Sequence, residues 1–256
     1  MTMRWLITGL GGTLAPVVAE VARKAGAEVV GWDRAQADPA DSNACAAWLR
    51  ACRADAIAHL AMGPPAWAAQ LAGHAAEQSL PFVFTSTAMV FHHQPDGPHA
   101  VGDPRTARDD YGRYKIACED AVLGACPGAS VVRIGWQIDP VRTGNNMLLT
   151  LDEWQRRDGC VAASRAWRPA CSFMADTAAA LVGLLRRPQP GVVHVDSNAE
   201  QGDSFDRIVA ALKTAFRRDH WLLRVNDDYR HDQRLAGGSS LVPPLAARLP
   251  LLAGPV

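Results

Sequence analysis

The chain has 256 residues, and its 26 lysines and arginines balance its 26 acids, so its formal net charge is zero. A protein that binds nucleic acid or an anionic membrane normally carries a basic excess, so this balance argues against both classes of partner. Hydrophobic residues make up 48% of the chain and charged residues 20%, which is typical of a globular protein. No apolar run approaches the roughly 20 residues that span a bilayer. We therefore expect a soluble, cytoplasmic protein.

Short apolar segments alternate with segments of helical periodicity through the first three quarters of the chain. The predicted strands are residues 4–8, 28–32, 56–61, 82–86, 130–134 and 191–195. The predicted helices are residues 14–25, 43–52, 66–78, 109–123, 175–185 and 205–216. Such alternation indicates a parallel sheet covered by helices on both faces. The expected fold is α/β, a Rossmann-type doubly wound parallel sheet in a single domain over residues 1–256.

Two segments, residues 137–172 and 219–256, interrupt this alternation. Ligands of open α/β sheets bind outside the carboxyl ends of the strands, where insertions build the substrate side. We therefore expect the two segments to form one small substrate-side lobe.

A glycine-rich turn, Gly9-x-x-Gly12-x-x-Ala15, lies between the first predicted strand and the first predicted helix. Such a turn lets the backbone approach a pyrophosphate, and the helix N-terminus presents N–H groups to the phosphates. The pattern predicts a dinucleotide site. The residues expected to contact the phosphates are Gly9, Gly11, Gly12, Thr13 and Leu14.

The adenosine end of the cofactor is expected at the ends of the second and third strands. Asp33 can accept hydrogen bonds from both ribose hydroxyls, which favours NAD, whereas Arg34 can pair with the 2′-phosphate of NADP. Asp33 could instead be an ordinary turn residue at the end of a strand. Further contacts are expected from Asp38 near the adenine amino group and from Leu60, Ala61 and Met62, with His59 packed inside the third strand.

Tyr111 and Lys115 are four residues apart on a predicted helix, so both side chains project from one face. The pair is informative because the chain has only three tyrosines and three lysines. A phenol has a pKa of about 10, and a nearby ammonium favours the phenolate and lowers that pKa. Tyr111 is therefore the predicted acid–base of hydride transfer, with Lys115 also holding the nicotinamide ribose. Tyr114 lies off this face and is the poorer candidate.

A hydroxyl at the end of the fourth strand could orient a substrate carbonyl. Thr87 is the preferred residue and Ser86 the alternative, although hydroxyls at strand ends are often only caps.

These motifs together resemble the extended short-chain dehydrogenase/reductase family, and within it the dTDP-4-dehydrorhamnose reductase group. The resemblance covers roughly residues 3–216. It is carried by residues 7–14, Asp33-Arg34, Asp38, Ser86-Thr87, Val90-Phe91, Tyr111-Gly112-Arg113, Lys115, Arg133, Trp136, residues 144–147, Asp176-Thr177-Ala178 and residues 191–197. It implies Thr87, Tyr111 and Lys115 as the catalytic residues, with Trp136 and Asn146 towards the substrate. Core packing for Trp136 and a helix cap for Asn146 are the alternatives.

Three departures from this family limit what the resemblance implies. Ala88 and Met89 replace the Asp-Tyr pair that usually follows the active threonine, so the sugar contacts are open. Residues 63–81 form a shorter segment than the family's, which includes a helix often used for dimerisation, so a homodimer is possible but not supported. The tail from Asp219 matches poorly, and its arginines Arg224, Arg230 and Arg234 are expected to face solvent rather than a diphosphate.

The expected function is NAD- or NADP-dependent hydride transfer to or from a carbonyl or alcohol of a small molecule resembling a nucleotide sugar, without a metal. An epimerase that retains NAD is one alternative. A non-catalytic, cofactor-binding regulatory protein is another, although such proteins commonly lose the tyrosine or the lysine that this chain keeps. The substrate, the reaction direction and the choice between NAD and NADP stay open.

Overall fold

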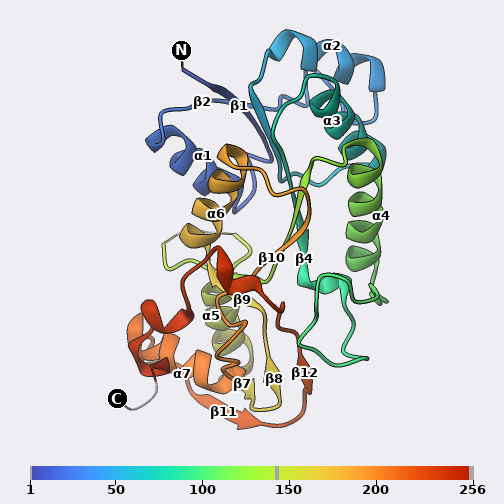
Figure 1. The fold of residues 1–256 in the computed structure, drawn as a ribbon. Helices are drawn as coiled ribbons and strands as arrows, with labels where there is room; N and C mark the ends of the chain where they lie inside the picture. Colours follow the sequence, from blue (N-terminus) through green and yellow to red (C-terminus); the bar gives the residue numbers. More distant parts are fainter. Residues whose placement is uncertain (1, 142–143, 254–256) are drawn as a thin grey trace. The chain divides into compact units, whose positions relative to one another are not determined.

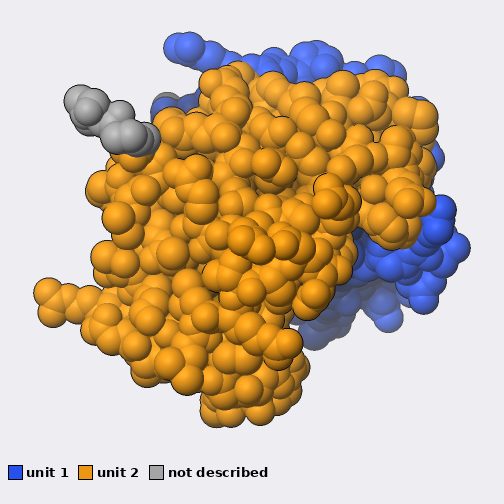
Figure 2. Space-filling model, turned by 90° about the horizontal axis from the view of Figure 1, so that it is seen from below, with its two compact units in different colours: residues 1–90, 107–133, 178–193 blue, residues 91–106, 134–177, 194–256 orange. Residues whose placement is uncertain are grey.

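A computed structural model of the chain describes residues 2–141 and 144–253. The chain forms two compact units, each built from three separate segments (Figures 1 and 2). The first unit comprises residues 1–90, 107–133 and 178–193, and the second comprises residues 91–106, 134–177 and 194–256. Both predicted substrate-side segments fall in the second unit, except that residues 142–143 and 254–256 lie outside the described residues. No helix within the described residues is long and apolar enough to cross a membrane.

The first unit is built on a six-stranded sheet in the order β10-β5-β4-β3-β1-β2. Its strands are β1 (Arg4–Thr8), β2 (Glu28–Gly31), β3 (Ala56–His59), β4 (Phe82–Thr87), β5 (Ser130–Ile134) and β10 (Gly191–Val195). The pairs β1–β2, β1–β3 and β3–β4 are parallel. The predicted Rossmann-type parallel sheet is thus confirmed, and all six predicted strands are present.

Helices cover both faces of this sheet (Figure 1). They are α1 (Ala15–Lys24), α2 (Ser42–Cys52), α3 (Pro65–Glu77), α4 (Asp110–Ala125) and α6 (Met174–Arg186), and the 3-10 helix η1 (Ala88–Val90) follows β4. One continuous core joins α2, α3 and α4 to β3, β4 and β5, with Leu49, Leu71, Val122 and Phe84 among its buried residues. The apolar periodicity seen in the sequence is therefore the stripe that each helix buries against the sheet.

Among its described residues, the second unit contains three short parallel strand pairs, two α-helices and three 3-10 helices. β6 (Trp136–Ile138) pairs with β9 (Cys171–Phe173), β7 (Val161–Ser164) with β11 (Leu223–Asn226), and β8 (Trp167–Arg168) with β12 (His231–Asp232). The remaining elements are α5 (Met147–Asp158), α7 (Phe205–Ala215) and the 3-10 helices η2 (Gly238–Ser240), η3 (Leu245–Ala247) and η4 (Pro250–Leu252). The predicted helix at residues 205–216 is confirmed as α7.

Asp196 holds three backbone positions of the second unit together. Its side chain is fully buried and accepts hydrogen bonds from the backbone N–H groups of Cys171 at 3.0 Å, Asn198 at 2.8 Å and Leu235 at 3.0 Å. Burial raises the pKa of this carboxyl to about 7, although the three N–H donors oppose the rise. The three donors would be unsatisfied without it, and each unsatisfied buried group costs about 1–3 kcal/mol.

A buried polar network joins β1 to β3 in the first unit. The Thr8 hydroxyl oxygen accepts hydrogen bonds from the N–H groups of Leu60 and Ala61 at 3.0 and 3.1 Å, and it lies 2.8 Å from His59 Nδ1. Because both lone pairs of the oxygen are used, the hydroxyl proton is donated to Nδ1, which must itself be unprotonated. Burial also disfavours the imidazolium and lowers the pKa of His59 to about 3. His59 is thus a packed strand histidine, as expected.

The low pKa of His59 predicts acid sensitivity. An imidazole whose pKa is lower in the folded state binds fewer protons when folded, so its contribution to stability is lost as the pH falls below its unfolded pKa of about 6.5. We expect the free energy of unfolding to drop by up to about 3 kcal/mol between pH 7 and pH 4 from this residue. In His59→Asn the amide oxygen can accept the Thr8 proton without titrating. Urea unfolding of that variant across this pH range should show a shallower loss, and an unchanged slope would contradict the prediction.

Candidate active site

The glycine-rich turn after β1 has the geometry of a phosphate-binding loop. Gly9 has φ +83°, a conformation that favours glycine, and the Gly12 N–H closes the turn on the Gly9 carbonyl at 2.8 Å. A Cβ on Gly9 would lie 3.0 Å from the backbone nitrogen of Ala61, whereas a Cβ on Gly11 would meet nothing within 4 Å. The turn therefore packs closely on the end of β3 and is open at Gly11.

Helix α1 begins directly after this turn with a phosphate-compatible N-terminus. Its N-cap residue, Leu14, provides no side-chain hydrogen bond, and no acid lies in the first turn. The N-terminal N–H groups and the helix dipole together favour an anion at this position. The cradle fits the pyrophosphate of a dinucleotide, and Gly9, Gly11, Gly12, Thr13 and Leu14 are the residues that would hold it.

The turn after β2 carries the residues predicted for the adenosine end. Asp33 acts as a turn residue as well, because its carboxylate accepts hydrogen bonds from the Ala35 N–H at 2.9 Å and from Gln36 Nε2 at 2.8 Å. Arg34 donates to the carbonyl of Met62, so its guanidinium lies at the end of β3. The carboxyl-terminal edge of the sheet, after β2 and β3, thus brings together Asp33, Arg34 and Met62.

The other adenosine-side candidates also belong to this edge. Asp38 is exposed, and its carboxylate accepts a hydrogen bond from the Ala40 N–H at 2.9 Å. Leu60 and Ala61 are held by the Thr8 hydroxyl, and Met62 exposes 50% of its surface. These contacts leave Asp38 and Met62 accessible to a ligand.

The predicted acid–base group lies beside the end of β4. The side chain of Thr87 lies close enough to Tyr111 to influence the pKa of its phenol, and Lys115 Nζ lies 5.9 Å from the centroid of the Tyr111 ring. Helix α4 closely approaches η1, which follows β4, at Gly112, where a Cβ would lie only 2.4 Å from the Met89 carbonyl oxygen. Glycine next to Tyr111 therefore lets α4 pack against η1, and the structure brings the three predicted catalytic residues together.

The pKa of Tyr111 differs from the expectation. Burial raises the pKa of this phenol, and this outweighs the opposite effect of the neighbouring Thr87 side chain. The expected lowering by Lys115 is wrong for this arrangement, because the lysine ammonium is directed to the Thr85 carbonyl at 2.8 Å. Burial lowers the pKa of Lys115 to about 8.

The two alternative residues have structural roles. Ser86 donates its hydroxyl to Glu119 at 2.5 Å in a buried contact. The Tyr114 hydroxyl donates to the Gly63 carbonyl at 2.9 Å and accepts from the Gly63 N–H at 3.1 Å, and burial raises its pKa to about 12. Thr87 and Tyr111 therefore remain the candidates for chemistry.

Trp136 and Asn146, predicted to lie towards a substrate, belong to the second unit. Asn146 is fully buried and caps α5, because its side-chain oxygen accepts a hydrogen bond from the Leu149 N–H at 3.2 Å. Trp136 is half-buried, with its ring centroid 6.1 Å from that of Trp167 and 6.2 Å from that of Phe205. The structure thus shows the alternative role that the sequence offered for each residue, a helix cap for Asn146 and aromatic packing for Trp136.

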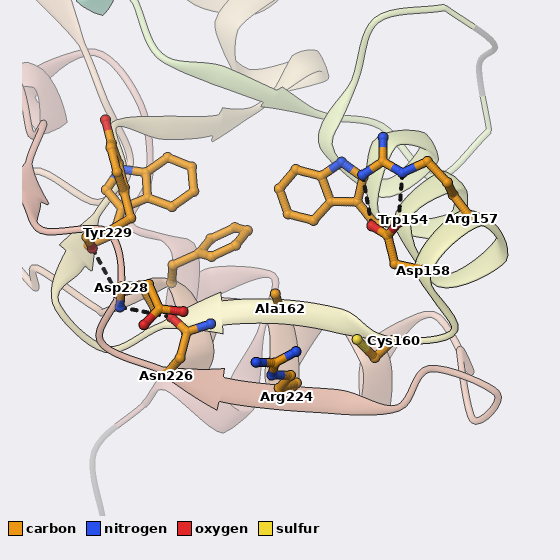
Figure 3. A pocket seen from close by; sticks show the side chains of 12 residues that line it. Trp154, Arg157, Asp158, Cys160, Ala162, Arg224, Asn226, Asp228 and Tyr229 are labelled. Atoms are coloured by element: carbon orange, nitrogen blue, oxygen red, sulfur yellow. Dashed lines mark hydrogen bonds and ion pairs between the residues drawn. The ribbon is translucent and has the colours of Figure 1, made fainter.

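A pocket of about 580 Å³ in the second unit was missed by the sequence reasoning (Figure 3). Its aromatic lining includes Trp154, Trp167, Phe205 and Tyr229. Trp154 and Tyr229 stand on opposite sides, with Ala162 and Arg224 between them. No local pattern in the sequence marks this pocket, because its aromatic residues are scattered between positions 154 and 229.

The tail arginines differ from one another. Arg224 lines this pocket, and none of the described residues forms a salt bridge with it. Arg234 does not face solvent as expected: it pairs with Asp232 at 2.7 Å and donates to the Ala199 carbonyl at 3.1 Å. Arg230 is exposed, in agreement with the expectation.

Comparisons with known proteins place this arrangement in a family. The RmlD substrate binding domain family matches residues 66–217, more than half of the chain. A dTDP-4-dehydrorhamnose reductase of Mycolicibacterium smegmatis is 30% identical over 235 residues, which is 83% of this chain and 69% of that protein. The chain belongs to the dTDP-4-dehydrorhamnose reductase family. The family match ends before the tail that supplies Arg224 and Tyr229 to the pocket.

Other members and solved structures agree with this membership. A dTDP-4-keto-6-deoxy-D-glucose reductase of Streptomyces niveus is 29% identical over 220 residues, covering 78% of this chain and 75% of that protein. The fold matches a Bacillus anthracis dTDP-4-dehydrorhamnose reductase solved with NADP, with TM-score 0.80, 16% identity and 97% of each chain covered. The prediction of a reductase of the extended short-chain family is confirmed.

The glycine turn gives a direct test of the cofactor cradle. We expect Gly9→Ala to destabilise the protein by about 1–3 kcal/mol, because alanine disfavours the positive φ, and to weaken NADH and NADPH binding through displacement of the loop from Ala61. Urea unfolding and fluorescence titration with each nucleotide measure both effects.

Gly124→Ala on α4 is the control for this substitution, because a Cβ there meets nothing within 4 Å. It should leave nucleotide affinity unchanged. Wild-type affinity in Gly9→Ala would contradict the proposed loop.

Proposed function

We propose that this protein reduces a carbonyl group of a nucleotide sugar, with Tyr111 as the proton donor. The observation that supports this most directly is the proximity of Tyr111 and Thr87 at the end of β4, with Lys115 one helical turn further along α4. The glycine turn of Gly9, Gly11 and Gly12 would hold NADH or NADPH, which would supply the hydride. As the carbonyl carbon gains the hydride, Tyr111 gives its phenolic proton to the carbonyl oxygen, and an alcohol results.

The protonated phenol of Tyr111 suits a role as proton donor in reduction. A phenol whose pKa lies above its ordinary value is fully protonated at neutral pH, so it is ready to donate. Thr87 would orient the substrate carbonyl through its hydroxyl. Lys115 donates one of its three ammonium protons to the Thr85 carbonyl and would use another to hold the nicotinamide ribose.

We assign the second unit, including the predicted segments 137–172 and 219–256, to the substrate. The aromatic rings of Trp154, Trp167 and Tyr229 suit stacking with a nucleobase, and the Arg224 guanidinium suits a diphosphate. Arg157, another guanidinium of the pocket, is already paired with Asp158 at 2.7 Å. The relatives named above are described as acting on dTDP sugars, so a dTDP-linked 4-keto-6-deoxy sugar is the substrate to test first.

Replacement of the catalytic phenol tests the chemistry. Tyr111→Phe should lower kcat by about 10²–10⁴-fold, since the proton donor is lost, while the dissociation constant for the reduced cofactor stays near the wild-type value. Steady-state kinetics with a dTDP-linked 4-keto sugar and cofactor titration measure the two effects separately.

Tyr114→Phe is the matched control, because it removes the hydroxyl that binds Gly63. It should lower thermal stability and leave kcat within about tenfold of wild type. Unchanged turnover in Tyr111→Phe would refute the assignment of the acid. Conversion of the sugar without net oxidation of the cofactor would indicate an epimerase instead.

Replacement of a pocket arginine tests the substrate site. Arg224→Ala should raise KM for the nucleotide sugar by about tenfold or more with little change in kcat, because a charge-assisted contact to the diphosphate is lost rather than a contact to the reacting atoms. Arg230→Ala, also in the exposed tail but outside the pocket lining, is the control and should leave KM unchanged. An equal effect of both substitutions, or of neither, would refute the role of Arg224.

A further inference from the structure

His231 lies next to Tyr229, one of the aromatic residues that line the pocket of the second unit. On the basis of the proposed function, we propose that His231 is a proton-sensitive positioning residue for the substrate. Its neutral imidazole holds Tyr229 in the pocket lining. Its protonation releases Tyr229 and weakens the binding of a nucleotide sugar.

Tyr229 depends on His231 for its position. The Tyr229 hydroxyl oxygen lies 3.0 Å from His231 Nδ1, and the Tyr229 ring meets the Trp167 ring edge to face, with centroids 5.3 Å apart. The pairing of β12 with β8 places His231 opposite Trp167. Because Tyr229 is 47% exposed, packing alone does not fix its ring. His231 is the only partner of its hydroxyl among the described residues, so this bond sets where the ring lies.

The surroundings of His231 suit a neutral imidazole. The residue is 3% exposed, Nδ1 is engaged by Tyr229, and Nε2 is buried without a hydrogen-bond partner among the described residues. An imidazolium donates from both nitrogens, so Nε2 would then carry a buried N–H with no acceptor. Such a charged, unsatisfied donor is costly. Burial accordingly lowers the pKa of His231 to about 4.

A second buried histidine also opposes a charge on His231. The His99 ring lies edge to face with the His231 ring, with centroids 6.1 Å apart, and the ring of the exposed His93 lies at 6.3 Å. His99 is 2% exposed, and within the described part of the chain its Nε2 also lacks a partner. Burial lowers the pKa of His99. Two imidazolium ions at this separation would repel each other, so protonation of either ring disfavours protonation of the other.

Three acids near the two buried rings favour their charged forms. Asp96 and Asp232 act on both rings, and Asp103 acts on the ring at position 99. Asp232 is itself paired with Arg234 at 2.7 Å, and Arg168, the charged residue of β8, donates to a backbone carbonyl. The effect of burial remains larger than that of the acids. Both imidazoles therefore stay neutral while this region of the second unit is closed.

Backbone hydrogen bonds close this region around both rings. The His99 N–H donates to the Arg234 carbonyl at 2.8 Å, and the Ala236 N–H donates to the His99 carbonyl at 2.8 Å. His99 and Leu235 thereby form a parallel bridge between residues 91–106 and the tail. When this bridge opens, water reaches both imidazoles, and their pKa returns to about 6.5. Protons therefore bind the open form more tightly, and a fall in pH favours opening.

Opening of the bridge also affects the substrate site. His231 lies a few residues before the bridged segment, and Tyr229 precedes His231 by two residues. Once His231 turns to water, the Tyr229 hydroxyl loses its partner. The pocket then loses one of the rings proposed to stack with the nucleobase. A fall in pH thus weakens substrate binding rather than the chemical step.

Amide hydrogen exchange of the full chain tests the opening without a substrate. In the wild type, the protection of the His99 and Ala236 amides, corrected for the intrinsic exchange rate at each pH, should fall by about tenfold or more between about pH 7.5 and pH 5.5. The fall should be smaller in His231→Asn, because an amide can bond to the Tyr229 hydroxyl without titrating. His220→Gln, which removes an exposed histidine of the same unit, is the matched control and should behave like the wild type.

Equilibrium binding of dTDP-glucose tests the effect on the pocket, because the diphosphate of this probe does not titrate in the same pH range. The wild-type Kd should rise by about fivefold or more on acidification from about pH 7.5 to pH 5.5. The Kd of His231→Asn should stay nearly constant. Tyr229→Phe keeps the ring but loses the bond to Nδ1, so it should bind the probe weakly already at neutral pH.

Constant amide protection across this pH range, or an equal fall in His231→Asn, would overturn the inference. A pH-independent affinity of the wild type for dTDP-glucose would overturn it as well. Failure of dTDP-glucose to bind at neutral pH would instead overturn the proposed substrate site, and the amide protection would still decide whether His231 controls the opening.

Discussion

The buried carboxylate of Glu119 determines where the catalytic helix lies. It accepts hydrogen bonds from Arg133 Nε at 2.9 Å, Arg133 Nη2 at 2.8 Å and the Ser86 hydroxyl at 2.5 Å, and both charged side chains are at most 3% exposed. Such a pair is costly to desolvate, and loss of one partner typically costs about 3–5 kcal/mol because the other charge is left buried. Helix α4 is thereby held in a single register against β4 and β5.

The register of α4 determines where the candidate catalytic residues lie. Tyr111, Lys115 and Glu119 are spaced by four residues and share one face of α4. With Glu119 bonded to Ser86, Lys115 reaches the carbonyl of Thr85 and Tyr111 reaches Thr87, so three successive turns of the helix contact one strand end. A single buried ion pair therefore positions groups that lie one and two turns away from it. In the same way, the hydrogen bonds from the Leu60 and Ala61 N–H groups to the Thr8 hydroxyl hold the end of β3 beside the glycine turn.

The sequence was sufficient for the parts of the fold that repeat a regular pattern. The apolar runs predicted β1, β5 and β10 at their observed ends, and the Tyr111–Lys115 spacing predicted a helix face that the structure contains. The predicted strand at residues 56–61 ends at His59 instead, because the next two N–H groups turn to the Thr8 hydroxyl. The details that failed depend on distant partners that no local pattern reveals.

Burial of Tyr111 and the contact of Arg234 with Ala199 are two such details. The pKa of Tyr111 follows from how deeply α4 packs, and the Arg234 guanidinium donates to the carbonyl of a residue 35 positions away in sequence. The strands of the second unit are two to four residues long, and β7 and β11 are about 60 residues apart in sequence. Periodicity cannot predict pairs of this kind, and the aromatic pocket that they line was missed for the same reason.

The interleaving of the two units constrains how the chain is made. The six-stranded sheet needs β10, which begins at Gly191, so the first unit is incomplete until about three quarters of the protein has been synthesised. Domains generally fold as units as they leave the ribosome. In this protein the sheet of the first unit cannot be completed beside β5 until residues 134–177 of the other unit, and then β10, have been synthesised. No single truncation of this chain separates the two units.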